Sequence, residues 1–223
     1  MNYCPDKLFQ ITYNIKVENS SSGSAFTFES NGERFLITAR HVVDSPSKRV
    51  EVETERGFEL VEYSRCIYPS NREVDLVAIK VENSKDLDLN FHPKFLKYSS
   101  HGLGLGFETF FLGYPYGLRN ASFRGKNRSF GLVKKAINSG VSYDSSGNAI
   151  GFLLDGHNNP GFSGGPCCCF IENKWHLIGG ISSYVVQQDS LFDERGTLRM
   201  IINENSGIIH CHNIKHLLDE LKK

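Results

Sequence analysis

Three segments of the sequence carry side chains that together could perform nucleophilic catalysis. Ser163 lies among glycines in the stretch 158–166, where residues without bulky side chains let a substrate approach the backbone. A serine hydroxyl needs a base to accept its proton, and His41 stands at the end of a β-rich run. Asp75, at the head of an apolar strand, could orient that imidazole. The sequence therefore predicts a base, an orienting carboxylate and a nucleophile, in the order His, Asp, Ser.

The serine motif also fits a second pattern. Residues 161–165 satisfy G-x-S-x-G, the nucleophile elbow of α/β-hydrolases, and Asp193 and His210 follow in the required order. That elbow needs a helix directly after the serine, whereas Gly164, Gly165 and Pro166 follow here, before a β-forming run. The sequence therefore disfavours the elbow.

The elements that must position these residues are mostly short strands, because β-branched and aromatic residues cluster in runs separated by Gly, Asn, Ser and Asp. The expected strands are 8–17, 24–29, 34–39, 50–53, 58–67, 74–81, 108–113, 128–137, 149–154, 166–171, 175–186, 198–202 and 207–211. Residues 82–106 resemble a connector between two halves, and 138–148 and 187–196 resemble loops. Residues 213–223 have helical apolar spacing, with Asn213 as a plausible N-cap. The predicted class is all-β with a C-terminal α-helix.

Composition excludes several classes of protein. The 223 residues carry 25 Lys+Arg and 25 Asp+Glu, so no basic excess favours a nucleic-acid partner. No apolar run approaches the roughly 18 residues that a membrane helix needs. The N-terminus shows no export signal, and the consecutive Cys167, Cys168 and Cys169 cannot bridge one another. We therefore expect a cytoplasmic protein with six reduced cysteines, and no membrane partner.

Three blocks around these residues, 38–41, 75–79 and 161–166, resemble the signature blocks of trypsin-like (chymotrypsin-fold) serine peptidases. Further stretches at 23–26, 112–118, 131–133 and 159–162 more closely resemble the HtrA/Deg branch of that family, without a PDZ domain. The likeness implies two packed six-stranded antiparallel β-barrels with the active site between them. It covers residues 23–223: a first barrel at about 23–85, the connector at about 82–106, a second barrel at about 107–212 and the helix at 213–223. Residues 1–22 would be an N-terminal extension.

The resemblance also implies roles for individual residues. His41, Asp75 and Ser163 would form the catalytic triad of a serine-type endopeptidase, and the backbone N–H groups of Gly161 and Ser163 would form its oxyanion hole. Substrate-binding residues would be His157, Asn158, Ser182, Ser183 and Tyr184, none of them acidic, so we expect weak cleavage after basic residues. No cofactor is implied, and the partners would be a protein or peptide substrate and an unidentified regulator.

The sequence leaves alternative interpretations of the function and of several single residues. A catalytically silent relative that binds peptides or partners in the same cleft is the alternative to an enzyme. His210, Cys211, His212 and His216 lack the spacing of a metal site, so we expect no metal there. The run Cys167–Cys169 is expected to fill a buried strand, with oxidation sensing as the alternative. Lys134 and Lys135 are expected to be a solvated pair.

Overall fold

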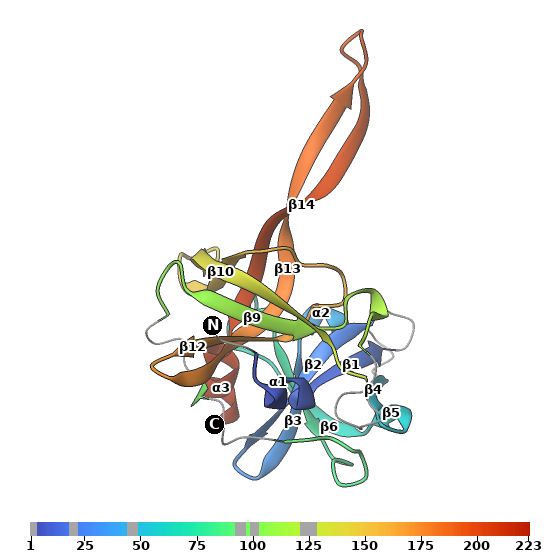
Figure 1. Cartoon of the computed structure of the whole chain (residues 1–223), viewed down its shortest axis with the longest axis vertical. Coiled ribbons are helices and arrows are strands. Elements are labelled where there is room, and N and C mark those ends of the chain that lie inside the picture. The colour runs from blue at the N-terminus through green and yellow to red at the C-terminus, as the bar shows by residue number, and fades with distance from the viewer. Residues whose placement is uncertain (1–3, 18–21, 44–48, 92–96, 99–102, 121–128) are drawn as a thin grey trace.

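The computed structural model describes residues 4–17, 22–43, 49–91, 97–98, 103–120 and 129–223. Its strands form two sheets that lie against each other (Figure 1). One sheet contains β1 (Thr12–Val17), β2 (Gly23–Ser30), β3 (Glu33–Thr38), β4 (Val50–Thr54), β5 (Gly57–Val61), β6 (Tyr63–Ile67) and β7 (Val77–Val81). The other contains β8 (Lys97–Tyr98), β9 (Glu108–Gly113), β10 (Leu132–Tyr143), β11 (Ala149–Asp155), β12 (Pro166–Ile171), β13 (Lys174–Phe192) and β14 (Leu198–Asn213).

Both sheets close into six-stranded barrels. In the first, the order is β5-β4-β1-β2-β3-β7-β6, and only Glu62 separates β5 from β6, so these two act as one bent strand that joins β4 to β7. In the second, the order β12-β9-β10-β11-β14-β13 is closed by pairing of β12 with β13, and β8 is added outside. The predicted all-β fold of two packed six-stranded antiparallel barrels with a C-terminal helix is confirmed.

The helices are short: α1 (Asp6–Ile11), α2 (Arg40–Val43), the 3-10 turn η1 (Pro115–Gly117) and α3 (Lys215–Leu221). Asn213, expected as the N-cap of the last helix, is the last residue of β14, and Ile214 occupies the N-cap position of α3; the Oδ1 of Asn213 accepts the Lys215 N–H over 3.0 Å. None of the described helices is long and apolar enough to cross a membrane.

Some strand boundaries were wrong. Residues 8–11 are helical, because Leu8 and Ile11 share one helical face and both are buried in the core. The stretch 138–148 belongs largely to β10, and 187–192 extends β13, whose partner β14 runs unbroken where two strands were expected. β10, β13 and β14 can contain these polar residues because their hairpins are stabilised by backbone hydrogen bonds and not by side-chain burial. Of the expected connector, residues 92–96 and 99–102 lie outside the described residues, and β8 lies within it.

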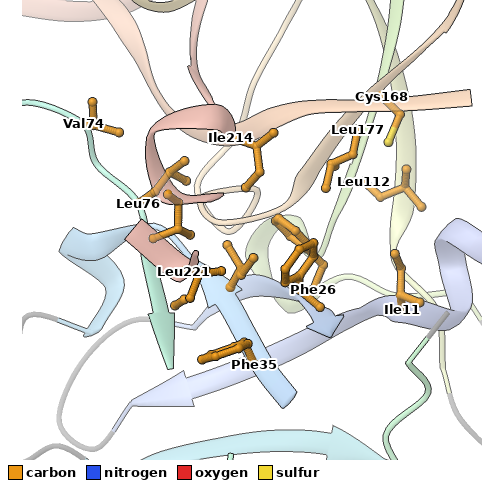
Figure 2. Close-up of a cluster of buried hydrophobic side chains, with 14 of the residues drawn as sticks. Ile11, Phe26, Phe35, Val74, Leu76, Leu112, Cys168, Leu177, Ile214 and Leu221 are labelled. Atoms are coloured by element: carbon orange, nitrogen blue, oxygen red, sulfur yellow. The ribbon is translucent and has the colours of Figure 1, made fainter. Parts of the chain in front are cut away.

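Three apolar clusters hold the fold. One fills the first barrel around Tyr13 and Val52, and one fills the second around Phe111 and Ile178. The third lies between the barrels and α3 and joins Phe26 and Phe35 of the first barrel to Leu112, Cys168 and Leu177 of the second. Ile214, just before α3, and Leu221, its last residue, complete this cluster (Figure 2). This shared core holds the two barrels in one relative position, so groups contributed by both can meet.

Candidate active site

His41 and Asp75 come from neighbouring segments of the first barrel. His41 lies in the single turn of α2, which follows β3. Asp75 precedes β7, and β7 pairs with β3. The Asp75 carboxylate accepts the His41 backbone N–H at Oδ1 over 2.9 Å and the imidazole Nδ1 at Oδ2 over 2.6 Å. A third donor, the Ser182 hydroxyl from β13, lies 2.5 Å from Oδ2. The imidazole is therefore oriented by a carboxylate that both barrels hold.

The contact between His41 and Asp75 shifts the pKa values of both side chains from their ordinary values. The hydrogen bond to Asp75 raises the pKa of His41 above its ordinary value of 6.5, against the opposite effect of partial burial. Burial acts to raise the pKa of Asp75, but the hydrogen bonds from His41 and Ser182 and the charge of His41 outweigh it, so the pKa lies below its ordinary 3.8. Asp75 is thus ionised at neutral pH, and its charge favours an imidazolium at His41.

Ser163 lies in the turn before β12, and its hydroxyl donates to the main-chain carbonyl of Ser182 over 2.8 Å. Among the described residues no hydrogen bond links it to His41, yet both side chains line one pocket. Hydrogen bonds of catalytic groups are often loose before substrate binds. β12, and not a helix, follows Ser163, which excludes the α/β-hydrolase elbow.

In the turn 161–165, some backbone N–H groups are hydrogen-bonded within the described chain and others are open, that is, without such a partner. The N–H groups of Phe162, Gly164 and Gly165 donate to carbonyls of the same turn or of β13. Those of Gly161 and Ser163 have no hydrogen-bond partner within the described part of the chain. Both residues are half-buried, and two open N–H groups beside a hydroxyl are suited to bind a developing oxyanion.

The orientation of the Gly161 N–H is set by the turn η1. The N–H of Tyr116 donates to the Pro160 carbonyl over 2.8 Å. Because a trans peptide directs its C=O and N–H to opposite sides, this bond directs the Gly161 N–H away from Tyr116. Gly161 has φ of +103°, and a Cβ there would lie 2.4 Å from the Tyr114 carbonyl oxygen, so only glycine fits.

Sequence reasoning did not assign a role to Ser24. Its hydroxyl donates to the Gly161 carbonyl over 2.6 Å and accepts the Tyr114 N–H over 2.9 Å, and its own N–H donates to the Ser163 carbonyl over 2.8 Å. Ser24 thus joins β2 of the first barrel to Gly161 and Ser163, the two residues with open N–H groups. The only signal in the sequence was the block 23–26, which served as a mark of family resemblance.

Lys134 was expected in solvent, and for this residue the prediction was wrong. Its Nζ donates to the His157 carbonyl over 2.6 Å and to Asn159 Oδ1 over 2.7 Å, and lies 5.4 Å from the centre of the Phe162 ring. Partial burial lowers the pKa of Lys134. Phe162 is fully buried and packs edge-on against Phe111. The ammonium of Lys134 and the ring of Phe162 therefore stabilise the segment that leads to Ser163. Lys135 forms an ion pair with Glu108.

A pocket of about 500 Å³ opens beside His41 and Ser163. It is lined by His41, Val42, Tyr116, Pro160, Gly161 and Ser163, together with Ser22. The predicted substrate-binding residues lie elsewhere. His157, Ser183 and Tyr184 are exposed or half-buried, and Ser182 is buried against Asp75. Asn158 is 2% exposed, and its carbonyl accepts the Asn205 side chain over 2.5 Å.

All six cysteines are free thiols in the structure. Burial raises the pKa of Cys168 well above 9.0 and that of Cys169 to about 12. Oxidation sensing needs an accessible thiolate, so the geometry contradicts that alternative for the run 167–169. The described residues contain no group of three or more His, Cys, Asp or Glu side chains placed to hold a metal ion.

Comparison with known proteins places these features in a family context. The sequence profile of the trypsin-like peptidase domain matches residues 23–179. No curated protein sequence gives a significant match.

Solved structures share the fold at low sequence identity. The HtrA-type protease AlgW with a tripeptide is 22% identical, with a TM-score of 0.62 over 96% of this chain and 60% of that chain. An inactive serine-to-alanine form of Rv3671c from M. tuberculosis H37Rv is 14% identical, with a TM-score of 0.63 over 97% of this chain and 87% of that one. The MamO protease domain from Magnetospirillum magneticum is 13% identical, with a TM-score of 0.56 over 96% and 97%. The chain thus spans less than two thirds of AlgW.

Proposed function

Because the chain belongs to the trypsin-like peptidase domain family, we propose that it is a serine endopeptidase that hydrolyses peptide bonds through an acyl-enzyme intermediate. The observation that carries the proposal is the hydrogen-bonded set of His41, Asp75 and Ser182, which lies beside the Ser163 hydroxyl. The pocket wall adds the open N–H groups of Gly161 and Ser163. A base, a nucleophile and an anion site are the parts that acyl transfer requires.

The proposed chemistry proceeds in two halves. His41 takes the proton of Ser163 as Oγ bonds to the substrate carbonyl carbon, and the two open N–H groups bind the resulting oxyanion. The C–N bond then breaks as the His41 imidazolium protonates the leaving amine. In the second half, water gives its proton to His41 and attacks the acyl group, and Ser163 recovers its proton when the acid product leaves. Asp75 orients His41 and stabilises its cation without taking the proton.

One observation favours the alternative, a catalytically silent domain that binds peptides in the same cleft. The Ser163 hydroxyl donates to Ser182 and not to His41, which would suit a serine that is never activated. In the enzymatic reading, an incoming substrate N–H competes for the Ser182 carbonyl and releases the hydroxyl toward His41. The two readings therefore differ in whether Ser163 is nucleophilic.

A fluorophosphonate probe separates them, because only an activated hydroxyl reacts with it. We expect the full chain to be labelled at Ser163, with labelling lost in Ser163→Ala and His41→Ala. Ser139→Ala is the matched control, since Ser139 is an exposed serine of β10 whose hydroxyl donates to the Ile137 carbonyl and not to a residue of the site. Absence of labelling in a folded full chain would support the silent domain, as would labelling that persists in Ser163→Ala.

A further inference from the structure

The ammonium of Lys134, on β10, lies against the segment 157–162 that precedes the nucleophile. Its Nζ donates to the His157 carbonyl over 2.6 Å and to Asn159 Oδ1 over 2.7 Å, and lies 5.4 Å from the centre of the Phe162 ring. An ammonium has three N–H groups, so these three partners can engage all of them. One side chain of β10 therefore contacts the beginning, the middle and the end of this segment.

The partners of Lys134 are two neutral oxygens and an aromatic ring. Partial burial lowers the pKa of Lys134, and no carboxylate of the described chain counters that effect. Taking a cation out of water without a counter-anion costs free energy, which the two hydrogen bonds and the ring must offset. Lys135, the next residue, is exposed and pairs with Glu108. The contact of Lys134 therefore stabilises a backbone segment and does not neutralise an acidic group.

The contact with Lys134 also fixes the orientation of the Asn159 side chain. An ammonium can only donate, so the amide oxygen must face Nζ and the amide nitrogen must face away. That nitrogen donates to the Tyr116 hydroxyl over 3.4 Å, and the backbone carbonyl of Asn159 accepts the Phe162 N–H over 3.2 Å. Asn159 therefore links the ammonium to η1 and to the residue directly before Ser163.

The peptide unit that carries the open Gly161 N–H lies between these contacts. It joins Pro160 to Gly161, and its two flanking residues, Asn159 and Phe162, both contact the ammonium. Gly161 has φ of +103°, and glycine gives the backbone wide conformational freedom, so residue type alone does not fix this peptide. The contacts on either side of the peptide therefore decide which way its N–H points.

We propose that Lys134 is a positioning residue, whose ammonium orders the segment 157–162 so that the Gly161 N–H faces the pocket of His41 and Ser163. The inference rests on the proposed function for the role of that N–H, and it goes beyond that function in assigning the order of the anion site to a side chain outside it. None of the described residues that line the pocket lies on β10, so Lys134 acts through the segment and not on a substrate.

Three variants of the full chain separate the charge of Lys134 from its bulk. Lys134→Met removes the charge and the hydrogen bonds but keeps a long, unbranched side chain. Lys134→Arg keeps a cation that can donate to both oxygens. Lys135→Met is the matched control, because it removes the same charge from the next residue of β10, whose ammonium pairs with Glu108 and not with the segment.

The first measurement is the rate at which a fluorophosphonate probe labels Ser163. We expect Lys134→Met to be labelled at least about tenfold more slowly than the unaltered chain, since a displaced oxyanion donor loses much of its effect. Lys134→Arg should restore most of the rate, and Lys135→Met should be labelled as fast as the unaltered chain. A loss that Lys134→Arg does not reverse, or an equal loss in Lys135→Met, would overturn the inference.

The second measurement is hydrogen–deuterium exchange, which reports the order of the segment without catalysis. Lys134→Met should exchange faster in peptides that cover 157–165, and the rest of the second barrel should exchange as in the unaltered chain. Unchanged exchange in 157–165 would overturn the inference.

If Lys134→Met does not fold, Asn159→Ala tests the same contact. It removes the Oδ1 acceptor and leaves Lys134 bonded to the His157 carbonyl. It should show the same two effects to a smaller extent, and a variant that labels and exchanges like the unaltered chain would overturn the inference.

The two measurements distinguish failure of this inference from failure of the proposed function. If the folded, unaltered chain is not labelled, the proposed function is wrong, and exchange in 157–165 alone decides whether Lys134 orders the segment. If the unaltered chain is labelled, and Lys134→Met is labelled equally fast despite faster exchange, the order of the segment does not govern the anion site. The inference is then wrong, and the proposed function stands.

Discussion

The hydroxyl of Ser163 donates to the main-chain carbonyl of Ser182 over 2.8 Å, while the side chain of Ser182 holds Asp75 from the opposite side of the site. One residue of β13 therefore binds both the Ser163 hydroxyl and the Asp75 carboxylate. This relationship makes the relative position of the two groups depend on β13.

Ser182→Ala should lower kcat/KM by about tenfold or more, since a hydrogen bond to a charged group contributes roughly 1.5–3 kcal/mol. The Ser182 hydroxyl lowers the pKa of Asp75, so its loss should also raise that pKa. Steady-state hydrolysis of a labelled unfolded protein measures the effect. Ser139→Ala controls for the general effect of removing a hydroxyl from a strand, and an equal loss in both variants would contradict the assigned role.

The acid limb of the pH–rate profile should have its midpoint above 6.5. Only neutral His41 can accept the Ser163 proton, and Asp75 raises the pKa of His41, so the base becomes available at a higher pH than in a free histidine. Asp75→Asn should move the midpoint to lower pH and cut turnover on the order of 10⁴-fold, by analogy with the Ser-His-Asp template. The pH dependence of fluorophosphonate labelling measures both effects. A midpoint that does not move in Asp75→Asn would argue against the coupling of the two groups.

The same pair makes stability depend on pH in two windows. The contribution of protonated His41 is present below the ordinary histidine pKa and is lost as pH rises through the raised pKa of the folded state. The contribution of ionised Asp75 is present above its ordinary pKa and is lost as pH falls through the lowered pKa of the folded state.

Gly161→Ala should abolish most labelling of Ser163, by about 100-fold or more, because one oxyanion donor would be displaced. The new Cβ would lie 2.4 Å from the Tyr114 carbonyl, in a backbone with φ of +103°. Gly196→Ala is the matched control: its φ is +74°, but nothing lies within 4 Å of a Cβ there. That control carries only the backbone strain of about 1–2 kcal/mol and should label normally. Normal labelling of Gly161→Ala would show that this turn does not form the anion site.

Reducing agent should leave activity and melting temperature unchanged, because the six cysteines form no disulfide. Iodoacetamide should modify Cys167, Cys168 and Cys169 only after unfolding, since burial raises the pKa of all three. Mass spectrometry of native and denatured samples measures the modification. Loss of folding on mild reduction would contradict this account.

Much of the candidate site could be predicted from the sequence, because each of its residues is recognisable from its type and from its neighbours along the chain. Ser163 lies in a glycine-rich turn, and each of His41 and Asp75 borders a short apolar strand, so residue type and neighbourhood were visible without a fold. The barrels were predictable for the same reason, since runs of β-branched residues recur between turn formers.

The tertiary structure decided what depends on distant segments meeting. Ser24, Tyr116 and Lys134 act on the nucleophile turn through a hydroxyl, a backbone N–H and an ammonium whose partners lie 23 to 137 positions away or in another loop. The stretch 187–196 was predicted as a loop because 187–190 is polar, yet residues 187–192 form a strand that is stabilised by pairing with β14 and not by burial. The hydrogen bond of the Ser163 hydroxyl to the Ser182 carbonyl likewise depends on the tertiary structure, because the two residues lie 19 positions apart and no sequence pattern specifies a rotamer.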